Sequence, residues 1–400
     1  MRELSQLTDK ILKSSSAVYA IIFAGIIIIA LFNSGISSGL GPSVFPLPKI
    51  SPLQPTSTPV NPNPNSQKIN EGYQSIQQQD YSKASDIADE ILANNPDNKE
   101  ALSLKGQALR MNGDNEKSLA YFDRLLQVDP GNSGAWAQKG WAFESLTRWQ
   151  EEADAFDNAI RLTTNTATLS RYWTGKGKAL NGLRKYNESL SAFNKALQLD
   201  PNYSEIYTEI GKVYRNQGNY PEAIASIDKT IAAKPDYGWA YTAKGFTYER
   251  MKKWDEMLDA FETALRVGGN NNLQANAWNG KGRAFYQLKR YDEAMSAYNT
   301  AIQLYPARFE TYTDKGKLLI SNGNYRDAIT EFDKSIEKNP NYSDAWWFKA
   351  VALENLGDHP GAGMAQARAA SLDPVKYGSK SLPGNVTPEV QVTSKLFYFF

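Results

Sequence analysis

The hydrophobic positions of the chain follow a helical period over most of its length, and residues 173–201 show this pattern clearly. Apolar residues recur there at helical spacing on each side of a break at residues 182–184, Gly-Leu-Arg. Two such stripes predict two amphipathic helices that pack antiparallel as a hairpin. A single hairpin cannot bury both of its faces, so it needs similar hairpins on either side.

The same unit recurs along the chain. Aligned on Gly177, the copies have anchor residues at Gly72, Gly106, Gly140, Gly177, Gly211, Gly245, Gly282, Gly316 and Ala350. Aromatic residues usually stand four positions before the anchor and nine positions after it, a small residue often follows at twelve, and proline at twenty-four. Glycine allows the helices to approach closely, aromatic rings fill the space between hairpins, and proline ends the second helix.

These positions together resemble the tetratricopeptide repeat (TPR) family over about residues 67–374. The resemblance implies an all-α fold, an α-solenoid of about nine TPR helical hairpins that form a right-handed superhelix. The first repeat, with Lys68 and Glu71, and the last repeat, with Ala350 and His359, depart from the pattern. We expect these two repeats to be polar caps of the array.

The anchors have a second period. Their spacing repeats as 34, 34 and 37 residues, so that Gly72, Gly177 and Gly282 lie 105 residues apart. We therefore predict three blocks of three repeats. The long steps lack the closing proline, at Thr164 and Gly269, and their three extra residues make nearly one helical turn. We expect the second helix to run on there and the angle between repeats to change.

A hydrophobic segment precedes the array. Residues 17–32, AVYAIIFAGIIIIALF, carry no charge, and residues 14–36 are long enough to cross a bilayer. We predict a single transmembrane helix at 14–36, with a cleaved signal peptide and a secreted protein as the alternative. The nearby basic residues all lie in the short N-terminus, residues 1–13, which the positive-inside rule places in the cytoplasm. The TPR domain would then lie outside the cytoplasm.

Two further segments are too polar to form a core. Residues 37–66 contain eight prolines and are predicted to be a proline-rich linker, which is either a semi-rigid spacer of up to about 90 Å or disordered. Residues 375–400 are predicted to be a flexible C-terminal tail. The tail ends in LFYFF, residues 396–400, which could pack on the last helix or dock on another copy of the chain.

Composition restricts the function. The 44 Lys and Arg residues nearly balance 43 Asp and Glu residues, so net charge gives no reason to expect a nucleic acid partner. The chain has no cysteine and one histidine, which leaves no material for thiolate metal sites or Ser-His triads. No phosphate loop, G-x-S-x-G or HExxH motif occurs. We predict no catalysis, metal or cofactor.

The TPR resemblance implies that the first helices of the hairpins line a concave groove that binds ligands. Residues just after each anchor, or one turn later, should face this groove. The predicted partner-binding residues are Trp141, Lys178, Asn181, Lys212, Arg215, Phe246, Glu249, Arg283, Tyr286 and Lys317. The bases would form a wall suited to an acidic segment or a terminal carboxylate. Alternatively, they are solvated residues paired with neighbours such as Glu144.

A second ladder of lysines stands just before the anchors, for example Lys105, Lys139 and Lys244. Its regularity favours a structural role, with aliphatic stems lying on the neighbouring helix and ammonium groups in water.

The sequence therefore predicts a membrane-anchored scaffold that binds a partner protein or peptide in the TPR groove. Two alternatives remain open. One is a self-associating structural protein of the cell envelope, and the other is an accessory subunit of an envelope enzyme.

Overall fold

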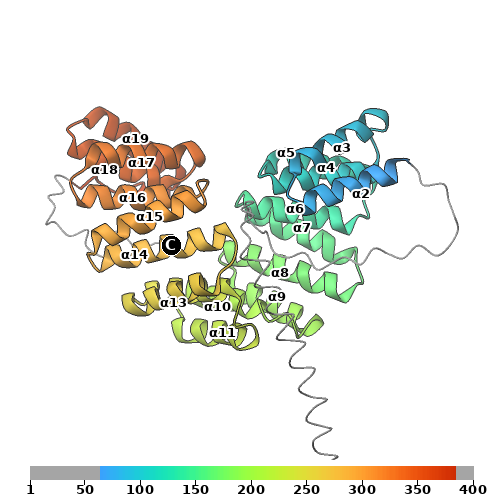
Figure 1. Cartoon of the computed structure of the whole chain (residues 1–400), viewed down its shortest axis with the longest axis horizontal. Helices are drawn as coiled ribbons and strands as arrows, with labels where there is room; N and C mark the ends of the chain where they lie inside the picture. Colours follow the sequence, from blue (N-terminus) through green and yellow to red (C-terminus); the bar gives the residue numbers. More distant parts are fainter. Residues whose placement is uncertain (1–63, 384–400) are drawn as a thin grey trace, which may run out of the picture. The chain divides into compact units, whose positions relative to one another are not determined.

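The computed structural model describes residues 64–383, which form nineteen α-helices (Figure 1). This part of the chain is an all-α helical repeat solenoid. The predicted transmembrane helix at residues 14–36 and nearly all of the linker lie outside the described residues, as do residues 384–400. Among residues 64–383, no helix is both long enough and apolar enough to span a membrane.

Helices α2 to α19 pair as hairpins, each made of an even-numbered helix and the odd-numbered helix that follows it. The helices are α2 (Pro64–Gln77), α3 (Tyr81–Asn94), α4 (Lys99–Met111), α5 (Asn115–Val128), α6 (Ser133–Ser145), α7 (Trp149–Arg161), α8 (Thr166–Gly182), α9 (Tyr186–Leu199), α10 (Ile206–Gln217), α11 (Tyr220–Ala233), α12 (Gly238–Arg250), α13 (Trp254–Val267), α14 (Asn271–Gln287), α15 (Tyr291–Leu304), α16 (Phe309–Ser321), α17 (Tyr325–Lys338), α18 (Ser343–Asn355), α19 (His359–Leu372) and α20 (Pro374–Tyr377).

The two sets of helices differ in their neighbours. Each even-numbered helix from α2 to α16 contacts the next even-numbered helix, whereas no two odd-numbered helices of the described part share a comparable contact. The even-numbered helices therefore crowd together and the odd-numbered helices diverge from one another. We call the surface formed by the even-numbered helices the inner face. The handedness of the superhelix stays a prediction.

Every hairpin turn has the same backbone feature. Seven positions after each anchor, a residue has a positive φ, and it is glycine in only some of the hairpins, such as Gly113 and Gly218. Thr147 takes this conformation with a φ of 56°, although a β-branched residue rarely does so. The left-handed residue reverses the chain within a few residues and starts the second helix directly after the first.

The extra residues of the two long steps lengthen the helix after the loop. Helices α8 and α14 each contain 17 residues, whereas the preceding α7 and α13 contain 13 and 14. The prediction that the second helix runs on is therefore wrong. Asn165 and Asn270 cap the longer helices, because their side-chain oxygens accept hydrogen bonds from Thr168 N and Leu273 N at 2.9 and 2.8 Å.

The core of most hairpins is built around a large residue sixteen positions after the anchor. Phe156 of α7 is fully buried, and its ring lies against Gly140 of α6 and Gly175 of α8. A Cβ atom would lie 2.8 Å from this ring at Gly140 and 2.3 Å at Gly175. One ring thus holds together three helices from two hairpins, which explains why the anchor and a second position in α8 are glycine.

The lysine ladder joins neighbouring hairpins. The ammonium groups of Lys139 and Lys244 lie 2.5 and 2.8 Å from carboxylates of Asp123 and Asp228 on the preceding odd-numbered helix. The same pairing occurs at Lys105, Lys176, Lys281 and Lys349. The ammonium groups are thus in ion pairs, where the sequence had suggested water. The carboxylates are about half exposed, so each pair contributes at most about 1 kcal/mol.

The chain continues past the last hairpin as a packed segment. The ring of Tyr377 in α20 stacks on Trp347 with ring centroids 4.8 Å apart, and its hydroxyl donates to Asp344 at 2.6 Å. Leu382 also packs on this cluster. Residues 375–383, predicted to begin a flexible tail, therefore cover the end of the array, because Tyr377 has an apolar surface and a carboxylate to bind.

We predict that Gly280→Ala destabilises the protein by about 1–3 kcal/mol, because its Cβ would lie 2.3 Å from the buried ring of Phe261. Gly363→Ala is the matched control. Gly363 is exposed within α19 with no atom within 4 Å of a Cβ, so alanine should stabilise the helix by about 0.5–1 kcal/mol. Urea unfolding followed by circular dichroism measures both changes. Equal effects of the two substitutions would contradict the packing described.

Candidate functional site

The ten predicted partner-binding residues lie on six even-numbered helices. They are Trp141 on α6, Lys178 and Asn181 on α8, Lys212 and Arg215 on α10, Phe246 and Glu249 on α12, Arg283 and Tyr286 on α14, and Lys317 on α16. All ten are partly buried. The structure shows which of them lie together and what else lies beside them.

Acidic residues lie between the predicted bases. The first charge chain, as we call it, contains Arg110, Glu144, Lys178, Glu209 and Lys212, from helices α4 to α10. Lys178 Nζ lies 3.1 Å from Glu144 Oε1, and Lys212 Nζ lies 2.7 Å from Glu209 Oε1. The negative charge of Glu144 also favours the charged form of Arg110, and the negative charge of Glu209 favours the charged form of Lys178. Positive and negative charges thus alternate across four helices.

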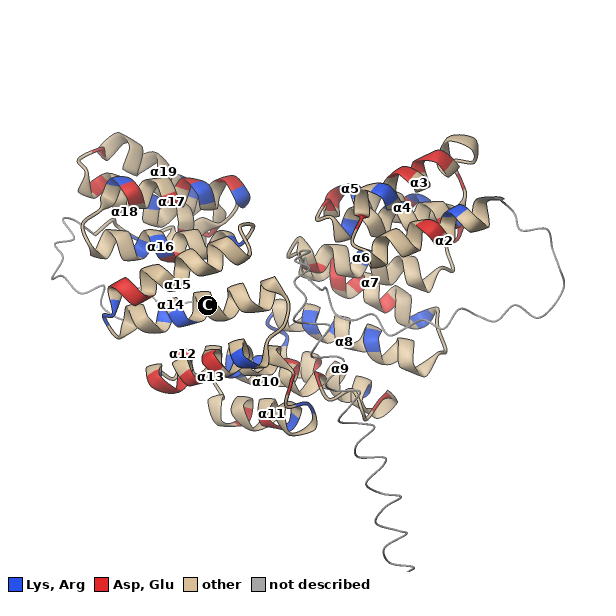
Figure 2. Ribbon diagram, viewed as in Figure 1, with Lys and Arg blue, Asp and Glu red and all other residues tan. Residues whose placement is uncertain are grey.

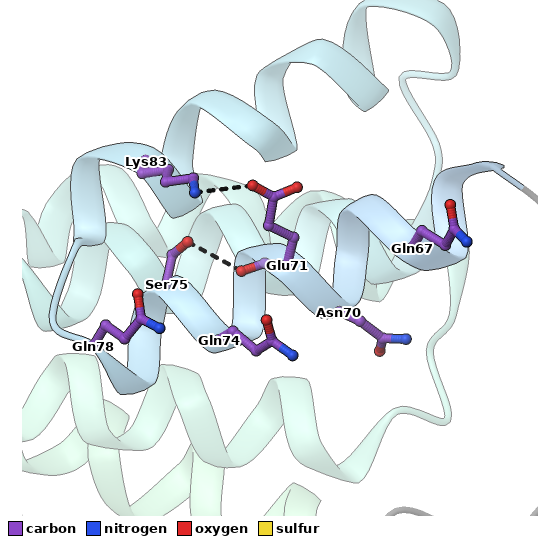
Figure 3. A pocket seen from close by; sticks show the side chains of 7 residues that line it. All are labelled: Gln67, Asn70, Glu71, Gln74, Ser75, Gln78 and Lys83. Atoms are coloured by element: carbon purple, nitrogen blue, oxygen red, sulfur yellow. Dashed lines mark hydrogen bonds and ion pairs between the residues drawn. The ribbon is translucent and has the colours of Figure 1, made fainter.

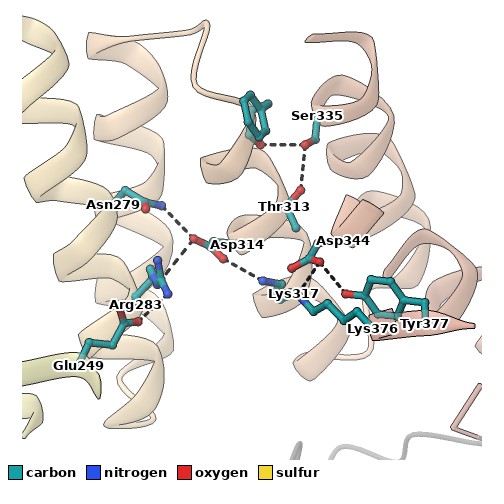
Figure 4. A network of polar contacts seen from close by, with 11 residues as sticks. Glu249, Asn279, Arg283, Thr313, Asp314, Lys317, Ser335, Asp344, Lys376 and Tyr377 are labelled. Carbon is teal, nitrogen blue, oxygen red and sulfur yellow. Dashed lines mark hydrogen bonds and ion pairs between the residues drawn. The ribbon is translucent and has the colours of Figure 1, made fainter. Parts of the chain in front are cut away.

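The second charge chain contains Arg215, Glu249, Arg283, Asp314 and Lys317, from helices α10 to α16. Arg283 Nη2 lies 2.7 Å from Glu249 Oε1, and its Nε lies 4.0 Å from Asp314 Oδ2 (Figure 4). Lys317 Nζ lies 3.1 Å from Asp314 Oδ1. The negative charge of Glu249 also favours the charged form of Arg215. Figure 2 likewise shows basic and acidic residues on neighbouring helices of the array.

Burial and charge act in opposite directions on these groups. Partial burial disfavours the charge of Asp314, but Lys317 and Arg283 outweigh it and hold the pKa of Asp314 below its usual value. For Lys178, burial is likewise opposed and outweighed by Glu144 and Glu209, so its pKa is raised. The neighbouring opposite charges therefore stabilise the charged forms of Asp314 and Lys178. The predicted basic wall is in fact a face of mixed charge.

Arg215 differs from the other bases. No hydrogen bond or ion pair involves its guanidinium within residues 64–383, although it lies partly buried near Glu249 and Glu209. Burial lowers its pKa, and the guanidinium still remains charged at neutral pH because its ordinary value is far higher. Lys212 and Arg283 already neutralise those two carboxylates. Arg215 is thus a base with donors to offer a ligand.

Aromatic rings lie beside the bases on the inner face. Trp141 stands between two guanidinium groups, with the Arg110 and Arg171 carbons 5.9 and 5.5 Å from its ring centroid. Arg283 lies 5.8 Å from the ring centroid of Phe246. These contacts keep the planar cations against apolar surface, where they are less hydrated than in open solvent.

Two other candidates connect neighbouring helices. Asn216 donates a hydrogen bond to Asn181 at 3.0 Å, and the hydroxyl of Tyr286 lies 2.7 Å from that of Ser321. Asn181 and Tyr286 therefore tie α8 to α10 and α14 to α16.

Family models now add to these observations. Models described as tetratricopeptide repeat match residues 71–133, 112–165, 204–237, 236–307 and 313–375, and a model described as TPR repeat matches residues 177–218. Together the matches cover more than half of the chain. The chain belongs to the tetratricopeptide repeat family. TPR proteins generally mediate protein–protein interactions, and the TPR fold is typically not catalytic.

Two relatives match short parts of this TPR chain. A DnaJ homolog subfamily C member 7 homolog of Schizosaccharomyces pombe is 40% identical over 55 residues, which is 14% of this chain and 12% of the relative. An uncharacterized protein of Methanocaldococcus jannaschii is 46% identical over 48 residues, 12% of this chain and 56% of the relative. The chain thus matches less than two thirds of the length of each.

Solved structures with a similar arrangement of helices include the APC/C hetero-tetramer Cut9-Hcn1, with 19% identity, a TM-score of 0.49, and 74% of this chain and 57% of that chain covered. MamA has 25% identity and a TM-score of 0.34, with 40% of this chain and 93% of that chain covered. YrrB, described as a TPR protein with an unusual peptide-binding site, has 23% identity and a TM-score of 0.33, with 46% and 93% covered.

Sequence reasoning missed Arg110, Glu209 and Asp314, which complete the two charge chains of the TPR array. For Arg110, which stands 34 positions before Glu144, the signal that could have found it is the spacing of one repeat. Glu209 and Asp314 do not follow this spacing. Lys178 and Arg283 stand 34 positions after the glutamates that they contact, so opposite charges at this offset on first helices indicate neighbours.

A depression of about 490 Å³ lies on α2 and α3 at the N-terminal end of the array (Figure 3). It is lined by Gln67, Asn70, Glu71, Gln74, Ser75, Gln78 and Lys83. Glu71 and Lys83 form an ion pair at 2.9 Å, and the remaining lining groups are amides and a hydroxyl. This surface is polar, as expected of a terminal repeat. Residues 64–383 contain no cluster of three or more His, Asp or Glu residues arranged to hold a metal ion.

Glu152 is a buried carboxyl under the first charge chain. It occupies the position twelve residues after the anchor Gly140, is fully buried, and neither of its oxygens has a hydrogen-bond partner. Burial, together with the negative charge of Glu144, raises its pKa to about 9, which Lys178 opposes only in part. The side chain is therefore neutral at pH 7.

We predict that Glu152 makes the TPR array less stable as pH rises. Between the ordinary pKa of 4.5 and the folded value of about 9, the folded state holds a proton that the unfolded state releases. Stability is therefore fully present below pH 4.5 and falls above it, by on the order of 3 kcal/mol at pH 7. Urea unfolding at several pH values from 5 to 8.5 measures this slope.

Glu152→Met should remove this part of the slope and stabilise the protein at pH 7 by about 1–3 kcal/mol. Methionine suits the site because Met257 is fully buried at the corresponding position 105 residues later. Glu151→Met, at the exposed neighbour, is the control and should leave the slope between pH 5 and 8.5 unchanged. If Glu152→Met keeps the full slope, Glu152 is not the group responsible.

Proposed function

We propose that this TPR chain binds an extended segment of a partner protein along its inner face, without catalysis. Membership of the TPR family supports a protein partner, and the mixed-charge inner face supports the location. The even-numbered helices place polar and aromatic side chains from successive repeats next to one another. Such a surface suits a segment that lies across several helices.

The main observation behind this proposal is that no hydrogen bond or ion pair within residues 64–383 involves the guanidinium of Arg215. A guanidinium offers several N–H donors in a fixed plane, and it matches a carboxylate with two parallel hydrogen bonds. The inner-face carboxylates near Arg215 are already paired with Lys212 and Arg283. We therefore assign Arg215 the role of receiving a carboxylate of the partner, either a side chain or a chain terminus. The ring of Phe246 supplies apolar surface on the next helix.

The segment before the array suggests how the domain is held. Residues 14–36 would anchor the chain in a membrane as a single helix with a cytoplasmic N-terminus. Residues 37–63 would then separate the TPR domain from the bilayer on the extracytoplasmic side. In this proposal the protein is a scaffold that presents its inner face to a partner near the membrane surface.

We predict that a photo-crosslinking amino acid at Phe246 captures the partner segment in cells, because Phe246 lies on the inner face. The same amino acid at Lys195, an exposed residue of the odd-numbered helix α9, is the control and should capture little. Mass spectrometry identifies the captured peptide, which should contain a carboxylate near the crosslink.

Arg215→Glu should reduce the yield of this crosslink at least tenfold, since it replaces attraction by repulsion. Lys195→Glu makes the same change of charge on the outer side and should leave the yield unchanged. Two results would contradict the proposed site. One is an equal crosslink yield at Phe246 and Lys195, and the other is a yield at Phe246 that Arg215→Glu does not change.

For the topology, we predict that protease added to intact cells degrades the TPR domain while residues 1–13 remain protected. Protection of the whole TPR domain would show that it faces the cytoplasm. A secreted product that lacks residues 1–36 would show that the segment is a cleaved signal peptide.

A further inference from the structure

The two charge chains are copies of one arrangement. Each residue of the second charge chain stands 105 positions after its counterpart in the first, and the sign of the charge is the same at all five positions. The contacts are repeated as well. The base on α8 or α14 lies 3.1 or 2.7 Å from the preceding glutamate, and the lysine on α10 or α16 lies 2.7 or 3.1 Å from the acid on its own helix.

The helices beneath the two charge chains have the same register. Thr208 and Thr230, on α10 and α11, are buried with their hydroxyl oxygens 3.0 Å apart. The corresponding residues of α16 and α17, Thr313 and Ser335, are buried and 2.9 Å apart (Figure 4). The same pair of buried hydroxyl groups therefore lies beneath each charge chain.

Two neighbouring positions on α8 and α14 have not kept this correspondence. Asn181 corresponds to Tyr286, and Arg171 corresponds to Asn276. Partly exposed ion pairs contribute little to stability, so packing alone does not require that five charges recur while their neighbours differ. A binding function shared by the two charge chains would require the same five charges in both.

The arrangement of five charges occurs twice in the array, although the array has three blocks of repeats. At 105 positions before Lys178, Glu209 and Lys212, the chain has Tyr73, Leu104 and Gln107, which are uncharged. The first block of repeats therefore has no equivalent charge chain.

Each charge chain has a surplus of one positive charge, since it contains three bases and two carboxylates. The first base of each has free donors. Arg110 donates from Nε to Gln138 at 2.9 Å, and no hydrogen bond or ion pair within residues 64–383 involves its two terminal nitrogens. Arg215 has Ala243 where Arg110 has Gln138, so all of its donors are available. An aromatic ring stands near each chain, Trp141 or Phe246.

We propose that the inner face holds two equivalent carboxylate-binding sites, at Arg110 and at Arg215, and that the partner is an extended acidic segment that occupies both. This rests on the proposed function and specifies the partner. The two sites are three even-numbered helices apart, which is roughly 30 Å at about 10 Å per helix. An extended chain spans this distance with about nine residues. The partner therefore carries two carboxylates at about this separation.

Two fluorescent Gly/Ser peptides of equal composition test this inference on the full-length chain in detergent micelles. Each contains two glutamates, which are about nine residues apart in one peptide and adjacent in the other. Fluorescence anisotropy at low ionic strength should show that the spaced peptide binds at least about tenfold more tightly, because only this peptide reaches both sites.

Arg110→Ala and Arg215→Ala should each reduce the affinity of the spaced peptide at least about tenfold, because each removes one of the two sites. Lys195→Ala on α9 is the control and should change neither affinity. Equal binding of the two peptides by the unmodified chain, with loss on Arg215→Ala, would leave one site and overturn this inference while the proposed function stands. Failure of both peptides to bind would overturn both.

Discussion

The packing of one buried ring against two glycines sets the approach of the helices at the two junctions between blocks of repeats. Phe156 contacts α6 at Gly140 and α8 at Gly175, and Phe261 makes the same contact with Gly245 and Gly280. Because no Cβ separates these helices from the ring, α6 lies close to α8, and α12 lies close to α14. Side chains that follow the anchors then meet across neighbouring helices, and the ion pairs of the inner face depend on this approach.

Much of this arrangement could be predicted from the sequence, because the repeat is marked by residues with steric roles. Glycine, aromatic and proline positions placed the hairpins, and the position just after the anchor placed Lys178 and Arg283 on the first helices. Partners in different repeats were harder to find. Glu209 and Asp314 precede their anchors, and no local pattern distinguishes an inner-face carboxylate from a solvated one.

Three further features of the structure could not be predicted from local sequence patterns. The asparagine caps of α8 and α14 decided which helix takes up the extra residues, although the missing prolines favoured the preceding helix. Glu152 stands in a position that usually holds a small residue, and its burial without a hydrogen-bond partner follows from the surrounding helices rather than from its own chemistry. Tyr377 packs on the array because Trp347 and Asp344 offer it a ring and an acceptor.

The central claim is that the two charge chains together hold one partner segment. Hydrogen exchange measured by mass spectrometry on the full-length chain, with and without the segment identified by crosslinking, tests it most directly. Binding should slow exchange in two separate regions, α4 to α6 and α10 to α12, and should leave the odd-numbered helices α9 and α15 unchanged. Protection confined to odd-numbered helices, or to one of the two regions, would contradict it.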